Sequence, residues 1–344
     1  MRRGSSAVLA VLGGLGPSAA ACSAQHGSGG VQSTYDSGGD TGTLSPTTDG
    51  GSDGSADDEA STSSQTYLRI AHVSPDMPPI DVCVALHGTG SFQGPLIGQL
   101  VAATAGDARE DADTDTVEGG AAAPGVAYSQ LSAYLALGPG QYDVRIVSGG
   151  ASSCSPLLDA GVDGAAGVPD STNLPALAVD ACTTLIVAGE ISPVGTDQGV
   201  AVVMLPDDAV LAGGAASLRA INAMPSEPSL DLGLGSATMW LPLLTDVRFG
   251  AASTRANPDD GALDSNGYIS IAPLSAQAMS VRPSSSDAAT DTASASSVTV
   301  PLGSIVTTIA IGGKTGDSAH PPALLLCTDN QPSGGILADC SIAQ

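Results

Sequence analysis

The sequence predicts an all-β protein with two tandem immunoglobulin-like β-sandwich domains after a disordered acidic tether. Three observations lead to this prediction. Short runs of alternating apolar residues recur along the chain and are separated by turns rich in Gly and Pro. No window of the sequence shows a capped helical stripe of apolar residues. One block that starts at residue 68 returns at residue 218, which indicates a duplication.

Residues 1–22 resemble a bacterial lipoprotein signal. Arg2 and Arg3 precede an apolar stretch that is too short to span a bilayer. Small residues then lead to Cys22, the position that receives the lipid, although Ala19 stands where leucine is usual. The same letters satisfy an ordinary cleavage site, so secretion without lipid is the alternative. Both interpretations predict an extracytoplasmic chain, and lipidation predicts anchoring in the cell envelope. The absence of aspartate directly after the cysteine favours the outer membrane or the cell surface.

Residues 23–66 predict the tether, because they are nearly all Ser, Gly, Thr and Asp. Such a composition has no apolar period and cannot bury enough surface to offset the entropy of the chain. A flexible segment of this length has an r.m.s. reach of about 35–40 Å. We therefore expect residues 23–66 to hold the folded part of the chain away from a membrane surface.

The charge of the chain narrows its possible partners. Acidic residues number 35 and basic residues 10, which gives a net charge of −25. Nucleic acids and anionic membranes require clustered Lys and Arg, whereas the basic residues here are scattered singly. The sequence therefore predicts no nucleic-acid partner. It leaves a lipid anchor as the membrane contact and an envelope protein or glycan as the expected ligand.

The duplication is visible in "LRIAHVSPDMPPIDVCV" at 68–84 and "LRAINAMPSEPSLDLGL" at 218–234, which align without a gap. Weaker matches follow in the same order, among them "CTTLIVAGE" with "VTTIAIGGK" and "VMLPDD" with "LLCTDN". The preserved order predicts two homologous domains at 67–214 and 215–344, joined in the small-residue stretch 212–216. We expect each domain to fold nearly independently.

These blocks resemble a bacterial extracytoplasmic family known as domain of unknown function 4397. Its members are often tandem and typically carry an Arg-x-x-His-x-Ser-Pro-Asp-x-Pro-x-x-Asp-Val pattern. Eight residues fill this pattern here: Arg69, His72, Ser74, Pro75, Asp76, Pro78, Asp81 and Val82. The resemblance covers 67–214 and, more loosely, 215–344, where Asn222, Met224 and Ser226 depart from the pattern. It implies an extracytoplasmic location and brings no activity with it.

The bend in the first block contains the weak functional candidates His72, Asp76 and Asp81. They could hold a metal or act as a base and its orienting partner, which is the basis of the alternative function, an extracytoplasmic hydrolase. The prolines nevertheless fix φ and remove N–H donors, which suits a simple turn. The second copy has Asn222 for His72 and Ser226 for Asp76, and both replacements serve a turn better than a metal site. We therefore expect a structural role.

The two apolar arms of the bend are expected to form adjacent strands of the first domain. Because side chains alternate between the two faces of a strand, Ile70, Val82 and Val84 should point into the core.

An acidic run offers the best candidate for a cation, and it is weak. Asp111, Asp113 and Asp115 alternate as in a calcium loop, but the required glycine and the final glutamate are missing. We expect a solvated loop, no metal and no cofactor. The sequence also lacks a zinc-type histidine pair, a nucleophile elbow and a phosphate-binding glycine loop. These observations predict a non-enzymatic surface module that binds a protein or glycan, or acts as a spacer.

Five of the 6 cysteines lie beyond the lipobox, in an oxidising compartment. An odd number predicts two disulfides and one cysteine left over. Cys83 with Cys154 is the preferred first pair and Cys327 with Cys340 the second, which leaves Cys182 as a small buried apolar residue. A pairing of Cys154 with Cys182, with Cys83 free, remains the alternative.

Overall fold

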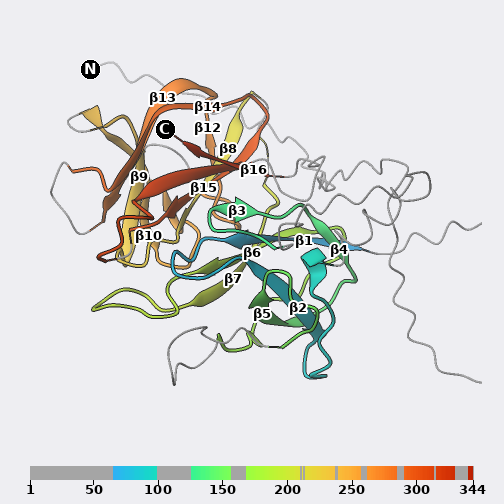
Figure 1. The fold of residues 1–344 in the computed structure, drawn as a ribbon. Coiled ribbons are helices and arrows are strands. Elements are labelled where there is room, and N and C mark those ends of the chain that lie inside the picture. Colours follow the sequence, from blue (N-terminus) through green and yellow to red (C-terminus); the bar gives the residue numbers. More distant parts are fainter. Residues whose placement is uncertain are drawn as a thin grey trace, which may run out of the picture.

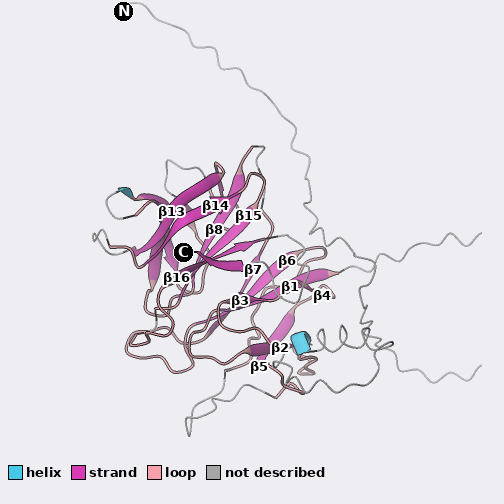
Figure 2. Ribbon diagram, turned by 45° about the horizontal axis from the view of Figure 1, so that its top comes forward, coloured by secondary structure: helices cyan, strands magenta, loops and turns pink. Residues whose placement is uncertain are grey.

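A computed structural model describes the folded part of the chain (Figure 1). The described residues are 65–98, 125–155, 168–209, 211, 214–236, 239–256, 262–284, 290–313, 315–329 and 340–343. Their regular structure is almost entirely β, which confirms the predicted fold class (Figure 2). The signal region 1–22 and the tether up to residue 64 lie outside the described residues. In the described part, none of the helices is long and apolar enough to cross a membrane.

The first set of strands lies in residues 65–209, which we call unit 1. It comprises β1 (Thr66–His72), β2 (Ile80–Leu86), β3 (Gln130–Leu131), β4 (Leu135–Leu137), β5 (Tyr142–Ser148), β6 (Cys182–Ala188) and β7 (Ala201–Pro206). One sheet has the order β3-β1-β6-β7, with β4 also paired to β1, and β2 pairs with β5 in the second sheet. Strands β1 and β6 run parallel, with Arg69 opposite Thr184.

The second set lies in residues 214–343, which we call unit 2. It comprises β8 (Ala216–Asn222), β9 (Ser229–Leu234), β10 (Leu241–Arg248), β11 (Arg255–Ala256), β12 (Ile269–Ile271), β13 (Leu274–Pro283), β14 (Ala293–Val300), β15 (Ile305–Ile311), β16 (Ala323–Thr328) and β17 (Cys340–Ala343). The sheets have the orders β12-β8-β15-β16-β17 and β11-β10-β9-β13-β14. Strands β8 and β15 are again parallel, with Arg219 opposite Thr307.

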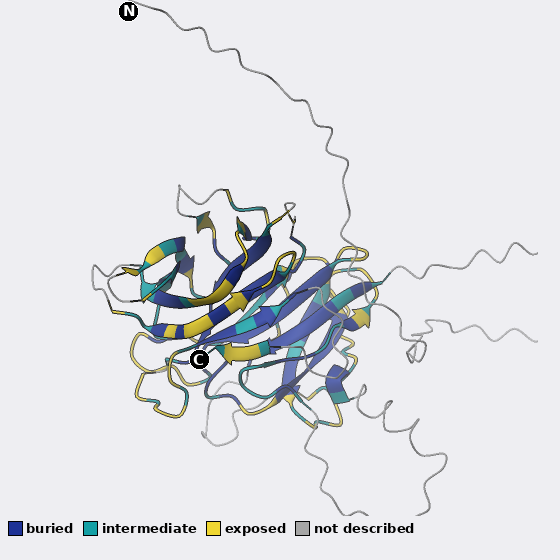
Figure 3. Ribbon diagram, turned by 90° about the horizontal axis from the view of Figure 1, so that it is seen from above, coloured by how far each residue is buried: buried dark blue, intermediate teal, exposed yellow. Residues whose placement is uncertain are grey.

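The four sheets form successive layers, with buried apolar side chains between each pair of neighbours. One cluster lies between the two sheets of unit 1, and another lies between those of unit 2. A third cluster joins Ala71 and Ile186 of unit 1 to Ile221 and Ile309 of unit 2. Strands β6, β8 and β15 are therefore buried throughout, and Figure 3 shows buried strands at the middle of the molecule. Burial on both faces explains why apolar residues predominate in β6 and β15, whereas β8 also carries Ser217, Arg219 and Asn222.

The two arms of the proline bend, β1 and β2, lie in different sheets. The expectation that they would be adjacent strands is wrong, because the bend carries the chain across the sandwich rather than along one sheet. Ile70, Val82 and Val84 nevertheless belong to the core of unit 1.

The strand ladders correct one alignment between the two copies. A gapless match of "CTTLIVAGE" with "VTTIAIGGK" places Thr184 on Thr308. In the structure Thr184 faces Arg69, and it is Thr307 that faces Arg219, so Thr184 corresponds to Thr307. A shift of one residue exchanges the two faces of a strand, and this shift decides which side chains meet at the middle of the molecule.

Disulfides join Cys83 to Cys154 and Cys327 to Cys340. The first pair connects β2 to the segment after β5, with its Cα atoms 5.9 Å apart. The second pair connects neighbouring strands β16 and β17. Cys182 is also disulfide-bonded, so the expectation that it is left over is wrong. That expectation rested on the odd number of cysteines that follow the lipobox, which leaves one of them without a partner.

Candidate functional site: a buried arginine–aspartate cluster between the units

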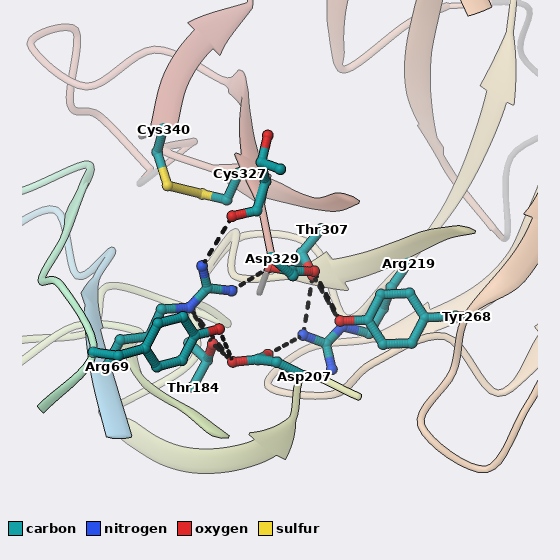
Figure 4. The surroundings of a disulfide bond; sticks show 11 residues. Arg69, Thr184, Asp207, Arg219, Tyr268, Thr307, Cys327, Asp329 and Cys340 are labelled. Carbon is teal, nitrogen blue, oxygen red and sulfur yellow. Dashed lines mark hydrogen bonds and ion pairs between the residues drawn. A yellow bond between two sulfur atoms is a disulfide. The ribbon is translucent and has the colours of Figure 1, made fainter. Parts of the chain in front are cut away.

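Four charged side chains meet where unit 1 contacts unit 2, and we call them the interunit quartet: Arg69, Asp207, Arg219 and Asp329 (Figure 4). The arginines come from β1 and β8, and the aspartates directly follow β7 and β16. Each residue is at most 1% exposed. Charged residues this deeply buried require partners, and the quartet supplies two positive and two negative charges.

Arg69 links the two units. Its Nε donates a hydrogen bond to Thr184 Oγ1 in unit 1 at 2.7 Å. Its Nη2 donates to Asp329 Oδ1, and its Nη1 lies 3.5 Å from the carbonyl oxygen of Thr328, both in unit 2. The guanidinium carbon also lies 5.0 Å from the centre of the Tyr134 ring. Arg69 is therefore held by its own unit while it binds the other.

Arg219 makes the same contacts in the opposite direction. Its Nε donates to Thr307 Oγ1 in unit 2 at 3.2 Å, and its Nη2 donates to Asp207 Oδ1 in unit 1 at 2.7 Å. Its Nη1 donates to the carbonyl oxygen of Pro206 at 2.5 Å, and its guanidinium carbon lies 4.4 Å from the Tyr268 ring centre. The contacts of Arg69 and Arg219 are thus related by an approximate twofold exchange of the units.

The two carboxylates are each oriented by a threonine and a tyrosine of their own unit. Asp207 Oδ2 accepts from Thr184 Oγ1 at 2.6 Å and from Tyr134 Oη at 2.8 Å. The equivalent bonds to Asp329 Oδ2 come from the Thr307 hydroxyl at 2.6 Å and the Tyr268 hydroxyl at 2.8 Å. Each unit therefore presents one oriented donor and one oriented acceptor to its neighbour.

The quartet is not electrostatically symmetric. Asp207 forms ion pairs with both arginines, at 2.7 Å to Arg219 and 3.5 Å to Arg69, whereas the ion pair of Asp329 in the described structure is with Arg69. Burial opposes ionisation of Asp207, but the two guanidiniums outweigh it and lower the pKa of this carboxyl. At Asp329 burial prevails and raises the pKa, although Arg69 acts against it. Asp207 is therefore the anionic centre of the quartet.

The features of the interunit quartet indicate a structural role. Its charges balance, its donors and acceptors are engaged with one another, and it is closed to solvent. Within the described residues, no group of three or more His, Cys, Asp or Glu could hold a metal ion. The arrangement can fix the orientation of one unit against the other.

The structure places His72 inside unit 1, fully buried, where it fastens the proline bend. Its Nε2 donates to the carbonyl oxygens of Met77 at 3.3 Å and Pro78 at 3.0 Å. The backbone N–H of Ser74 donates to Nδ1 at 3.4 Å. Burial lowers the pKa of His72 to about 4, even though the two carbonyl groups act in the opposite direction. His72 is therefore a neutral imidazole at physiological pH.

Asn222 fastens the corresponding bend of unit 2 with the same pair of bonds. Its Nδ2 donates to the carbonyl oxygen of Glu227 at 2.8 Å, and its Oδ1 accepts from the N–H of Met224 at 3.0 Å. In both bends an acceptor carbonyl group lies five residues after the donor. Met77 accepts from His72, and Glu227 accepts from Asn222.

Asp76 and Asp81 each bind a different segment of backbone. Asp76 accepts hydrogen bonds from the N–H groups of Ile191 at 3.0 Å and Ser192 at 3.1 Å, after β6. Asp81 accepts from Ile97 at 2.9 Å and Gly98 at 2.8 Å. Burial raises the pKa of Asp81, against the effect of these N–H groups. Both carboxylates secure loops, so each of the three candidates of the bend is engaged with backbone groups.

The remaining candidates, Cys22, Asp111, Asp113 and Asp115, lie outside the described residues. The quartet was missed by sequence reasoning, although its signal is present. Arg69 and Arg219 recur in the first block of each copy, and Asp207 and Asp329 recur in the last block. The signal is an arginine that recurs between the apolar residues of a strand, together with an aspartate that recurs directly after one.

Comparison with known proteins gives one family match. Residues 104–233 match the model of a domain of unknown function, DUF4397. This match supports the resemblance noted in the sequence. A search of the curated proteins finds no match to this chain. The DUF4397 match spans both units, since it includes β3 to β8 and reaches into β9. Thr184, Asp207 and Arg219 therefore lie inside it, while Arg69 and Asp329 lie outside.

Proposed function

We propose that this protein is a non-enzymatic cell-envelope lipoprotein that presents two rigidly joined β-sandwich units to an envelope protein or glycan, or uses them as a spacer. The observation that carries the proposal is the interunit quartet. Its four charged side chains hold one unit in a fixed orientation against the other, and such rigidity suits a spacer or a binding platform.

The absence of an enzymatic role is supported by the chemistry of the bend. A hydrolase at this position would need His72 to reach a substrate and exchange protons near neutral pH. His72 is instead buried, has a pKa of about 4 and donates to backbone carbonyl groups. This proposal can be tested with a panel of ester, glycoside and peptide substrates. We expect no turnover that depends on His72, and turnover by the wild type that disappears in a folded His72→Asn variant would favour the hydrolase.

An extracytoplasmic location is supported by the disulfides Cys83–Cys154 and Cys327–Cys340, since such bonds persist in oxidising compartments. The lipid anchor at Cys22 goes further and rests on the signal-like sequence, and it requires a partner other than Cys22 for the disulfide of Cys182. Cells grown with a labelled fatty acid should yield labelled wild-type protein in the membrane fraction. Cys22→Ser should lose the label and either leave the membrane or remain unprocessed.

The chemistry of sulfur offers a second test of the anchor, because a cysteine that carries a lipid thioether cannot also form a disulfide. Mass spectrometry of the mature, unreduced protein should find the thioether on Cys22. A disulfide between Cys22 and Cys182 in the mature protein, or a fully soluble and unlabelled wild type, would rule out the anchor.

A further inference from the structure

The contact between the units is made by two faces that carry the same polar groups. The Arg69 face of unit 1 consists of Arg69, Tyr134, Thr184 and Asp207, and the Arg219 face of unit 2 consists of Arg219, Tyr268, Thr307 and Asp329. Each face holds its own aspartate and points its arginine at the aspartate of the other. Both faces therefore carry one donor and one acceptor, and an approximate twofold exchange relates them. Self-complementary interfaces between two protein copies have this arrangement.

The apolar residues around the quartet distinguish the two faces. At equivalent positions the Arg69 face has Ala71, Leu131 and Ala188, whereas the Arg219 face has Ile221, Ala252 and Ile311. Small and large side chains therefore exchange places between the faces, which is the pattern by which two surfaces interdigitate. The Arg69 face is complementary to an Arg219 face, and two Arg69 faces would leave gaps where alanine meets alanine.

Only the connector between β7 and β8 decides which Arg219 face is bound. That connector runs from Asp207 to Ala215, and its first residues already contact unit 2, because Asn266 Nδ2 donates to the carbonyl oxygen of Asp208 at 2.6 Å and Ala209 packs against Tyr268. An Arg219 face supplied by a second molecule would offer the same hydrogen bonds and the same apolar contacts. Short connectors favour the intramolecular arrangement through an effective concentration on the order of millimolar.

We propose that the Arg69 face is also a docking surface for unit 2 of a second copy of this chain, so that two molecules exchange units and form a closed dimer. In such a dimer each chain contributes one Arg69 face and one Arg219 face, and the quartet is completed twice. The arrangement is closed, so it stops at two chains. Because the same contacts form within one chain, the monomer prevails in dilute solution and the dimer forms at high concentration or on joint refolding.

Two full-length charge-reversal variants test this proposal. Arg69→Asp places like charges opposite Asp329, and Asp329→Arg places like charges opposite Arg69. Neither variant can complete its quartet alone or with a copy of itself. Mixed and refolded together, they can form a dimer with one native quartet and one in which only the pair between positions 69 and 329 has reversed charges. We expect light scattering and native mass spectrometry to find this mixed dimer at least tenfold more abundant than either dimer of one variant.

Arg145→Asp is the matched control, because Arg145 pairs with Asp170 at 2.7 Å within unit 1 and outside the quartet. Mixed with Asp329→Arg, it should form no such dimer. The milder pair Arg69→Leu and Asp329→Leu covers the case in which a charge-reversal variant does not fold, since the mixed dimer then has one native and one apolar contact. Failure of both pairs to form a mixed dimer would overturn the proposal.

Discussion

Unit 1 and unit 2 hold the same bend with different side chains, and the difference shows what the duplication preserved. His72 and Asn222 each donate to a carbonyl group on the far side of the bend and each accept the N–H of the residue two positions on. The preserved property is this pair of hydrogen bonds. An imidazole and an amide can both provide it, so the residue type was free to change.

The arginines behave in the opposite way. Arg69 and Arg219 are identical in the two units, and each uses Nε for a threonine of its own unit and Nη2 for an aspartate of the other. Only a planar guanidinium presents several donors in one rigid fork, so lysine could not span both partners in the same way. The arginine is therefore the same in both units, because no other residue type can make these hydrogen bonds with the same geometry.

The largest effect should come from removing one carboxylate of the quartet. Asp207 pairs with two arginines and Asp329 with one, so Asp207→Leu should destabilise the protein more than Asp329→Leu. Losing one partner of a buried ion pair costs about 3–5 kcal/mol, because a charge is left without compensation. Urea denaturation of both variants measures the difference. Equal losses of less than about 1 kcal/mol would mean that the quartet contributes little.

The two disulfides should differ by a smaller amount in the free energy of unfolding that each contributes. Cys83 and Cys154 are 71 residues apart, whereas Cys327 and Cys340 are 13 apart. In the chain-entropy account, the longer loop contributes about 4 kcal/mol and the shorter about 3 kcal/mol. Paired Cys→Ala variants of each bridge, compared by denaturant unfolding, check this order. A larger loss from the Cys327 and Cys340 pair would show that contacts of β17 with the interunit cluster outweigh loop entropy.

Acid should weaken unit 1 through His72. Its pKa is about 4 when folded and about 6.5 when unfolded, so the unfolded chain binds more protons between these values. The stability that the neutral imidazole contributes is present above pH 6.5 and is lost as the pH falls towards 4. The full loss is about 3 kcal/mol, at about 1.4 kcal/mol per pKa unit.

His72→Asn removes this titration and copies the bonding of Asn222. Unfolding free energies at pH 7 and pH 4.5 should therefore differ less in the variant than in the wild type. The carboxylates titrate in both proteins, and their contribution cancels in the comparison. An unchanged pH dependence would mean that His72 is not buried as a neutral group.

The smallest effect is expected from the same substitution at neutral pH. His72→Asn keeps one donor and one acceptor for the bend and should cost about 1 kcal/mol. The reverse change, Asn222→His, places a larger ring at a fully buried position and should cost about 1–3 kcal/mol. Thermal unfolding of the two variants measures this asymmetry. A greater loss from His72→Asn would show that the imidazole has a role that the amide cannot fill.

Much of the fold follows from local sequence. Alternating apolar residues and Gly-rich turns predict an all-β chain, and "RIAHVSPDMPPIDV" predicts a bend because its prolines cannot continue a ladder. The interunit quartet does not follow, because Arg69 and Asp329 are 260 residues apart and belong to different copies. A repeat indicates that Arg69 and Arg219 matter, but each finds its aspartate in the other copy. The gapless alignment of Thr184 with Thr308 fails for a related reason, since only the ladder defines which residues share a face.

Differential scanning calorimetry of residues 66–344 tests the central claim most directly. If the quartet and its apolar surroundings join the units into one body, the wild type should unfold in a single transition whose calorimetric and van't Hoff enthalpies agree. Asp207→Leu should divide that transition into two. Two separate transitions in the wild type, at temperatures that Asp207→Leu does not change, would contradict the claim and favour the nearly independent domains expected from the sequence.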